Sequence, residues 1–400
     1  HDSSRSKSST PALRVIPLGG LHEIGKNTCV FEYGDELMLV DAGLAFPSDG
    51  MHGVNVVMPD TTFLKENQRR IKGMIVTHGH EDHIGAIPYF AVELGVPLYA
   101  TPFTAELIRR KLLEADITDE VELVVVEEPN TSFQVGSFNI TYLPLAHSIA
   151  EGNALLIDTP YGRVFHTGDW KLDDEPIIGQ PTTEVELTNL GHEGLLSLVC
   201  DSTNVFNPTQ SGSEGEVRRS LLQEVNDHKG KRILVTTFAS NVARLQTLGE
   251  VACATGRKLC VAGRSLEKII EVSQMSGYLT NFPETVDFDT AMSLPRGELL
   301  ILATGGQGEP RAALSRIAET RHPIQLTAGD VVLFSSKQIP GNELSIGRVM
   351  NQLSQQGILM ITDRQSAIHV SGHPGRPELE ALYSWLRPKV LVPVHGEARH

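Results

Sequence analysis

The sequence predicts an α/β protein in two parts, in which one α/β segment is inserted late into another. Three observations support this fold class. Short apolar runs separated by Gly-rich or Asp-Gly breaks fill the chain up to about residue 207, and strand and helix patterns alternate from 208 to 364. Histidine-rich strand ends return after residue 365. Alternating strands and helices are typical of a parallel sheet with helices on its faces.

The first part is expected to consist mainly of strands. Their alternating or continuous apolar patterns place them at residues 13–18, 28–33, 37–40, 74–77, 121–126, 138–143, 154–158, 164–167 and 195–200. The first three strands read as a β-meander. Helical periodicity is expected at 84–94, directly after a histidine cluster, so that cluster lies on a loop between a strand and a helix.

In the inserted part, Ser213 is the expected N-cap of a helix, with Glu216 three residues later. Further strands are expected at 233–236, 259–262, 299–303 and 331–334, and helices at 241–255, 266–275, 312–318 and 344–353. The resulting organisation is a disordered polar tail at 1–10, a first domain at 11–207, an inserted domain at 208–364 and a returning segment at 365–400. The returning strand ends are IHVSGH and VLVPVHG.

Composition narrows the class of protein. No apolar run approaches the ~20 residues of a membrane span. The four cysteines form no CxxC pair and are expected to be buried, inert thiols, which fits a reducing cytoplasm. The net charge is −15, yet residues 208–364 hold 17 Lys/Arg against 16 Asp/Glu. That segment is therefore either the place of a polyanion contact or simply a mixed solvated surface.

A metal site is predicted at residues 78–83, HGHEDH. His78 and His80 alternate along an extended stretch and can grip one ion, while Asp82 and His83 face a second. Imidazole and carboxylate ligands without cysteine suit a catalytic zinc site better than a structural one. A loop of solvated histidines is the alternative.

Two ions need further ligands, and three positions share the required setting. His147, Asp169 and His395 each follow an apolar strand and precede small or loop-forming residues. Each alone could instead be a core histidine or a turn-forming aspartate. Beside a cluster that needs ligands, they become candidates.

Together these motifs resemble the metallo-β-lactamase superfamily and, within it, the ribonuclease J family of β-CASP nucleases. The similarity is carried by HGHEDH, LGGLHEIGKN, LVDAG, CDSTN, FASN, ATGGQGEP and HVSGH, and it extends over the chain after residue 10. It implies a metallo-β-lactamase αββα sandwich with an inserted β-CASP domain. Members usually carry a further domain, involved in dimer formation, after the last metal-binding histidine, whereas this sequence stops at His400.

The resemblance also implies roles for single residues. One metal would be bound by His78, His80 and His147, the other by Asp82, His83 and His395, with Asp169 bridging both. The catalytic residues implied are Asp82, His373 and Asp201. Asp201 would orient a histidine, and His373 would act at the scissile phosphate, although a packing role at a strand end is the alternative for His373. Asp41 in LVDAG is either an acid supporting the site or a turn former. The segments expected to contact substrate are Phe238, Ala239, Ser240, Asn241, His369, Val370, Ser371, Gly372 and His373.

The implied function is two-metal hydrolysis of phosphodiester bonds in RNA maturation and decay, with 5′-to-3′ exoribonuclease and endoribonuclease activities. The two divalent ions are expected to be Zn²⁺, with Mn²⁺ or Mg²⁺ as alternatives. The expected partner is single-stranded RNA with a 5′-monophosphate, and the full-length form is expected to be a dimer or tetramer. A small-molecule metallohydrolase and an inert RNA-binding scaffold are the other functions considered.

Overall fold

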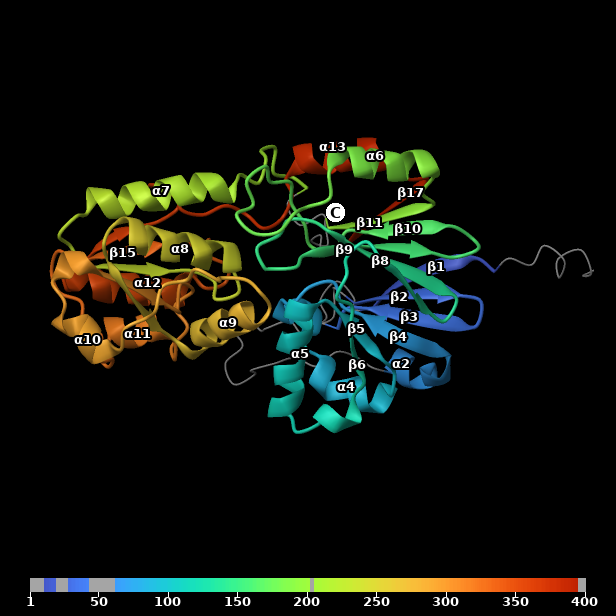
Figure 1. Ribbon diagram of the computed structural model, residues 1–400, viewed down its shortest axis with the longest axis horizontal. Helices are drawn as coiled ribbons and strands as arrows, with labels where there is room; N and C mark the ends of the chain where they lie inside the picture. The colour runs from blue at the N-terminus through green and yellow to red at the C-terminus, as the bar shows by residue number, and fades with distance from the viewer. Residues whose placement is uncertain (1–10, 19–27, 43–61, 202–204, 395–400) are drawn as a thin grey trace, which may run out of the picture.

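The computed structural model describes residues 11–18, 28–42, 62–201 and 205–394 of the 400-residue chain. These residues form two lobes that lie side by side (Figure 1). The first lobe contains two six-stranded sheets and the second contains one five-stranded sheet. This confirms the α/β class and the two-part organisation, while the boundaries at 208 and 364 stay predictions.

The first sheet begins as the expected meander. Strands β1, β2 and β3 pair antiparallel, and β3 to β6 continue in parallel. The strands, in sheet order, are β1 (Leu13–Leu18), β2 (Thr28–Tyr33), β3 (Glu36–Val40), β4 (Ile71–Ile75), β5 (Leu98–Ala100) and β6 (Leu123–Val125).

The second sheet joins strands from both ends of the chain. Strand β17 of the returning segment pairs in parallel with β11, with Val394 opposite Asp201. The strands, in sheet order, are β17 (Val390–Val394), β11 (Ser197–Asp201), β10 (Arg163–His166), β9 (Asn153–Asp158), β8 (Phe138–Pro144) and β7 (Ser132–Val135).

These two sheets pack face to face, and helices cover their outer faces. Phe31 and Met38 of the first sheet meet Phe138 and Leu155 of the second in the core between them. Helices α4 and α5 pack on the outer face of the first sheet, and α6 and α13 pack on the second. The helices of this lobe are α2 (Thr62–Glu66), η1 (Gln68–Arg70), α3 (Glu81–Ile84), α4 (Ile87–Leu94), α5 (Pro102–Glu114), η2 (Thr118–Glu120), α6 (Glu184–Glu193) and α13 (Arg376–Leu386).

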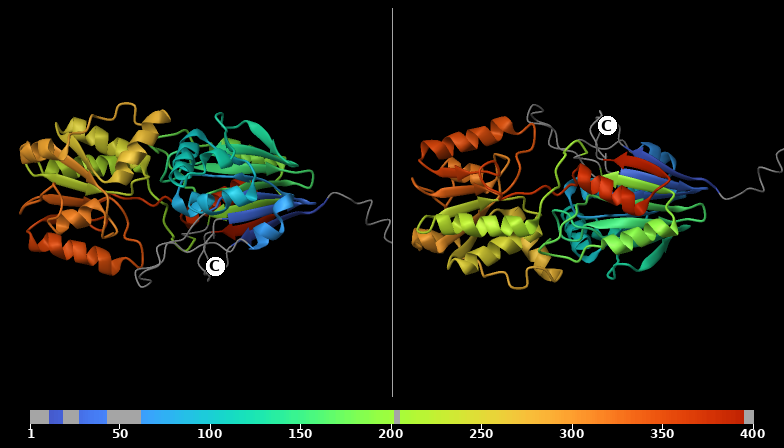
Figure 2. Two further views of the ribbon diagram at one scale, coloured as in Figure 1. Left: turned by 90° about the horizontal axis from the view of Figure 1, so that it is seen from below. Right: turned by 90° about the horizontal axis from the view of Figure 1, so that it is seen from above.

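The second lobe is a parallel sheet buried on both faces (Figure 2). Helices α7 to α9 cover one face and α10 to α12 the other, so its strands read as continuous apolar runs. The strands, in sheet order, are β13 (Lys258–Ala262), β14 (Leu299–Ala303), β12 (Ile233–Thr236), β15 (Val331–Phe334) and β16 (Leu359–Ile361). The helices are α7 (Glu214–Asp227), α8 (Val242–Ala254), α9 (Arg264–Met275), α10 (Phe288–Ser293), η3 (Arg296–Glu298), α11 (Ala313–Ala318) and α12 (Glu343–Gln355).

The two connections between the lobes lie against each other. Arg376 N, at the end of the return connection, donates to Asn207 O of the outbound connection over 2.9 Å. Ser211 of the outbound connection donates to Glu378 of α13 through both its N–H and its hydroxyl.

Two local expectations are wrong. The helix expected at 84–94 is interrupted near its start: α3 ends at Ile84, and α4 begins at Ile87, after Gly85-Ala86. The IHVSGH segment is not a strand. Polar groups along it bond to distant residues instead of a neighbouring strand: Ile368 O accepts from Ser335 Oγ at 2.5 Å, and Gly372 O accepts from His147 Nδ1 at 2.6 Å.

Candidate active site

The candidate ligands gather where loops leave the two sheets of the first lobe. His78 and His80 follow β4, Asp82 and His83 open the short helix α3, His147 follows β8, and Asp169 follows β10. They form two overlapping groups whose potential ligand atoms all lie within 4.8 Å of one another. The groups are His78, His80, His147 and Asp169, and His78, Asp82, His83 and Asp169.

Asp169 belongs to both groups, as a bridging ligand would. His78 also belongs to both, although it is expected with one ion only. His395 lies outside the described residues, so its place in the cluster stays a prediction, as does the assignment of residues to ions.

Three of the candidate histidines are oriented as metal ligands are, whereas His80 turns Nδ1 to His147 Nε2 at 3.0 Å. His147 Nδ1 donates to Gly372 O, and His83 Nδ1 donates to Asp41 Oδ2 at 2.7 Å. Thr77 Oγ1 donates its proton to Asp41 Oδ2, so it must accept a hydrogen bond from His78 Nδ1, at 2.9 Å. Each of these three rings thus has its Nδ1–H bound to a protein oxygen and turns Nε2 towards the cluster, the arrangement that fixes the ligating nitrogen in metal sites.

One buried nitrogen supports this fit directly. Among the described residues, His78 Nε2 makes no hydrogen bond, and Asp169 Oδ2 lies at ion-pair distance, 3.4 Å away. A buried nitrogen of this kind is costly unless a partner such as a cation occupies the space before it. The donor set therefore fits divalent cations.

Asp41 supports the cluster from behind. It follows β3 in the left-handed backbone conformation (φ 63°), which aspartate tolerates better than most residues. Its carboxylate accepts from Thr77 N and Oγ1 and from His83. Of the two roles considered for Asp41, the structure shows the supporting one; Thr77 is a contributor that the sequence patterns did not single out.

The electrostatics differ between neighbouring rings. Burial, reinforced by His78, lowers the pKa of His80 to about 3, and burial with His80 and His78 lowers the pKa of His147 well below its usual value. Burial acts the same way on His83, but Asp169, Asp82 and Asp41 outweigh it and raise its pKa. Neutral imidazoles are the form that binds cations, so the lowered pKa values of His80 and His147 favour binding, whereas a cation must displace a proton from His83.

His373 lies beside the cluster and is paired with Asp201. Its Nδ1 donates to Asp201 Oδ2 at 2.7 Å, and its ring centroid is 5.4 Å from that of His147. Although burial opposes the charged form, Asp201 outweighs it and raises the pKa of His373 to about 9. These atoms form a third group with Asp169. The Asp201 carboxylate thus orients the ring and leaves Nε2 as its other functional nitrogen.

The return connection brings residues 369–372 to this site. Gly372 packs so closely that an added Cβ would lie 2.6 Å from Ser148 Oγ. Glycine is therefore required there. His369 is half-buried, and burial with Arg244 lowers its pKa to about 3.

Residues 238–241 precede α8 in the second lobe. Phe238 is exposed, whereas Asn241 is buried and its side-chain oxygen caps α8 by accepting from Arg244 N. The structure connects this segment to residues 368–372 through Arg244, whose guanidinium donates to Ser335, the residue that bonds Ile368 O.

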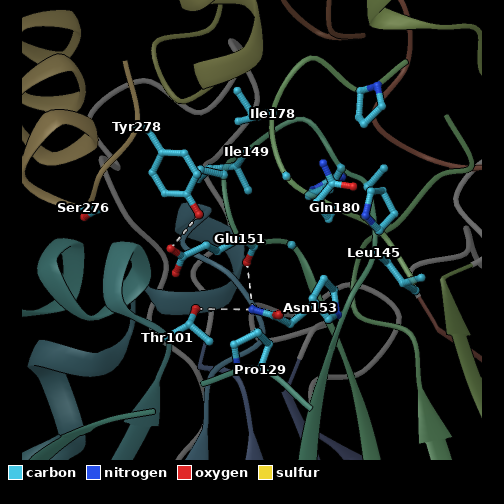
Figure 3. Close-up of a pocket in the computed structure, with 18 of the residues that line it drawn as sticks. Thr101, Pro129, Leu145, Ile149, Glu151, Asn153, Ile178, Gln180, Ser276 and Tyr278 are labelled. Carbon is cyan, nitrogen blue, oxygen red and sulfur yellow. Dashed lines mark hydrogen bonds between the residues drawn. The ribbon is translucent and has the colours of Figure 1, made fainter. Parts of the chain in front are cut away.

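A cavity of about 400 Å³ opens beside His147, between the two lobes (Figure 3). Glu151 lies at its centre, accepting from Phe103 N and from the hydroxyl of Tyr278 in the second lobe. Asn153 donates to Thr101 and to the Glu151 carbonyl. The sequence patterns did not indicate this contact between lobes, because Glu151 and Tyr278 belong to no motif.

Three protein-family models match the chain. The β-lactamase superfamily domain matches residues 38–188, and the β-CASP domain of ribonuclease J matches residues 230–353. The RNA specificity domain of Zn-dependent metallo-hydrolases matches residues 360–400. In the described ranges of the chain, no helix is long and apolar enough to cross a bilayer.

Curated relatives match nearly the whole chain. Ribonuclease J of Sinorhizobium meliloti is 42% identical over 97% of this chain and 69% of its own length. Ribonuclease J of Synechocystis is 45% identical over 98% of this chain and 61% of its own. Ribonuclease J 1 of Streptococcus pyogenes is 41% identical over 96% of this chain and 69% of its own. These relatives are thus longer than the sequence described.

A solved structure shows the same fold. A protein of unknown function from Enterococcus faecalis aligns with a TM-score of 0.66 at 15% identity, covering 96% of this chain and 95% of its own. With the matched domains and the relatives, the His/Asp cluster leads to one conclusion: the chain belongs to the ribonuclease J family of metal-dependent β-CASP ribonucleases.

Proposed function

We propose that this chain degrades RNA from the 5′ end towards the 3′ end and also cleaves it internally, in RNA maturation and decay. One observation carries the proposal: two overlapping groups of potential metal ligands lie beside the His373–Asp201 pair, at the junction with the second lobe. The names of the relatives and the matched RNA specificity domain support RNA as the substrate.

Two divalent ions are proposed for the cluster, with Zn²⁺ first and Mn²⁺ or Mg²⁺ as alternatives. Nitrogen-rich ligand sets without cysteine favour zinc in a catalytic site. His78, His80, His147, Asp82, His83 and Asp169, together with His395, would hold them. When bound, such ions polarise phosphoryl oxygens and activate water for attack on phosphorus.

The protein groups contribute orientation and proton transfer. Asp201 holds His373 so that Nε2 is the ring atom available to hold or deliver a proton at the leaving oxygen. Gly372 ties the segment carrying His373 to His147, so the proton-transfer group and a ligand are fixed relative to each other. Pre-set donors cost no reorganisation during the reaction.

Single-stranded RNA with a 5′-monophosphate is the proposed substrate. Ser240 and the Ser371–Gly372 backbone are the proposed contacts of the terminal phosphate. Asn241 is a third proposed contact, through its side-chain amide nitrogen, because its side-chain oxygen caps α8.

For the longer protein we propose a homodimer or tetramer, and for its location the cytoplasm, where unpaired cysteines stay reduced. Light scattering of a full-length protein and cell fractionation would test these two points.

The activity is tested with end-labelled RNA bearing a 5′-monophosphate or a 5′-triphosphate, after chelation and metal add-back. Mononucleotides should be released faster from the monophosphate substrate, and only with metal present. Absence of RNA cleavage with every metal would disprove the proposed activity. Equal cleavage rates on both substrates would instead disprove only the proposed recognition of the 5′-monophosphate.

A further inference from the structure

We propose that Glu378 is a positioning residue for the candidate active site, an inference that rests on the function proposed above. Glu378 lies in the first turn of α13 and is only 2% exposed. Its carboxylate accepts four hydrogen bonds, two at each oxygen. The donors are Ser211 N at 2.6 Å and Gly375 N at 3.1 Å to Oε1, and Leu172 N at 2.7 Å and Ser211 Oγ at 2.9 Å to Oε2.

These donors belong to three different segments of the chain. Leu172 is three residues after Asp169, and Gly375 is two residues after His373. Ser211 lies in the outbound connection to the second lobe. One carboxylate therefore holds the loop after a candidate bridging ligand, the loop after the proposed proton donor, and the root of the lobe expected to contact RNA.

The loop from Asp169 is anchored at other points as well. Lys171 N donates to Ala146 O at 2.7 Å, next to His147. Asp173 accepts from Ser213 Oγ at 2.7 Å and from Glu214 N at 2.9 Å, at the start of α7. Glu378 holds the stretch between these anchors, so its loss should loosen Leu172 without detaching the loop.

Replacement by glutamine has a definite geometric result. An amide nitrogen at the Oε1 position would face two backbone N–H donors, Ser211 N and Gly375 N. At the Oε2 position it would face Leu172 N and a hydroxyl that can turn to accept. The amide oxygen should therefore take the Oε1 position, and the bond to Leu172 is the one that Glu378→Gln loses.

The matched control is Glu214→Gln. Glu214 is also a buried glutamate (5% exposed) at the junction of the lobes. Its carboxylate pairs with Arg244, with contacts of 3.2 and 2.8 Å, and makes no hydrogen bond to the described residues of the loops after Asp169 or His373. Both variants remove one buried negative charge, so they separate positioning from general loss of stability.

The kinetic test uses 5′-monophosphate RNA and metal-loaded protein. Glu378→Gln should lower kcat by about 10- to 100-fold, the scale of a misplaced reacting group, with KM and metal content nearly unchanged. Glu214→Gln should keep kcat close to that of the unaltered protein, even if its thermal unfolding midpoint falls as much as that of Glu378→Gln. Should Glu378→Gln fail to fold, Glu378→Asp, which keeps the charge but shortens the side chain, takes its place.

A second readout does not depend on activity. Trp170 is fully buried between Asp169 and Lys171, and the chain has one other tryptophan, Trp385. With 5-fluorotryptophan incorporated and Trp385→Phe used for assignment, the ¹⁹F signal of Trp170 should broaden or shift in Glu378→Gln but not in Glu214→Gln.

Equal kcat losses in both variants, or a Trp170 signal that does not respond to Glu378→Gln, would overturn the positioning role. An unaltered protein without RNase activity would disprove the proposed function instead. The Trp170 signal would then decide on Glu378 by itself.

Discussion

His373 and His83 both donate through Nδ1 to a buried aspartate, but the two rings differ in their exposure to solvent and in their surroundings. The His83 side chain is 2% exposed and its Nε2 lies 3.1 Å from Asp169 Oδ2, inside the cluster. The His373 side chain is 28% exposed and is turned towards the site from the return connection. The first setting suits a ligand, and the second suits a group that meets substrate.

His373→Ala should therefore slow the chemical step by about 100- to 10,000-fold, the usual contribution of acid–base catalysis. Metal content and RNA affinity should change little, because the ligand groups remain intact. Single-turnover cleavage, metal analysis and RNA binding measure the three quantities. His83→Ala is the contrast and should lose metal and activity together. If His373→Ala loses folding and activity to the same degree, its role is in packing.

The cysteines give a second prediction at this scale. Cys29, Cys200 and Cys260 are buried, and burial raises the pKa of each thiol, to about 12 for Cys29 and about 11 for Cys260. Cys253, near the end of α8, is exposed, so the expectation that the cysteines are buried is wrong for this one.

A thiol reagent such as DTNB should consequently label one cysteine rapidly in the native protein and the other three only after denaturation. Cys253→Ser should abolish the rapid phase. Rapid labelling of a second thiol in that variant would show that a buried cysteine is accessible.

Among the helices, two N-caps allow a matched comparison. Thr183 caps α6 by accepting from Glu186 N, in an exposed setting. Ser213 caps α7 by accepting from Gly215 N and also donates to Asp173 Oδ1. The expected cap at Ser213 is thus confirmed, with an additional bond to the first lobe.

Thr183→Ala should lower the free energy of unfolding by about 0.5–2 kcal/mol, the usual value of a cap. Ser213→Ala should exceed it by about 1 kcal/mol, because its bond to the Asp173 carboxylate is partly buried, whereas the bond that Thr183 Oγ1 donates to Glu186 Oε1 is exposed to solvent. Urea denaturation of both variants measures the difference. A smaller loss in Ser213→Ala would mean that the bond to Asp173 adds no stability.

The accuracy of the predicted elements follows from their burial. The strands at 233–236, 299–303 and 331–334 agree with the structure to the residue, because both faces are buried and the apolar runs are continuous. Helix α13 was not expected, since its sequence lies among the histidine motifs of the returning segment. The irregular course of residues 368–373 is set by Ser335, His147 and Asp201, which are distant in sequence and invisible to local patterns.

Over the whole molecule, the lobes are also joined opposite the chain connections. Tyr278 donates to Glu151 Oε2 at 2.8 Å, and its ring packs edge-on against Phe103. Burial and Glu151 raise the pKa of Tyr278, so the phenol stays protonated and donates.

Tyr278→Phe keeps the ring contact and removes only this hydrogen bond. It should lower the free energy of unfolding by about 1.5–3 kcal/mol, the scale of a bond to a charged acceptor. Tyr161→Phe, at an exposed tyrosine, is the control and should have almost no effect. Thermal and urea unfolding report both. Equal midpoints for the two variants would show that solvent replaces the bond between lobes at no cost.

At this scale the sequence identifies the candidate ligands but not the residues that position them. The HGHEDH motif can be recognised because its histidines and acids lie within six consecutive residues. His147 and Asp169 can be recognised because each follows an apolar strand. The role of Glu378 cannot be predicted from the sequence, because its donors come from positions 172, 211 and 375 and converge only after both lobes have formed.

The adjacent connections at Asn207 and Arg376 have a consequence for how such a protein can be rebuilt. A hydrogen bond joins the backbones of the two connections at these residues. Strands β11 and β17, which precede and follow the second lobe in the chain, also pair directly with each other. The second lobe is therefore a cassette whose two ends lie next to each other. Replacing it with another domain whose ends are equally close adds little to the entropic cost of closing the chain between them. Insertions with closely spaced ends are those that folded scaffolds tolerate best. The same first lobe can thus carry different cassettes while the loops with the candidate ligands keep their geometry, provided that each cassette restores the donors to Glu378.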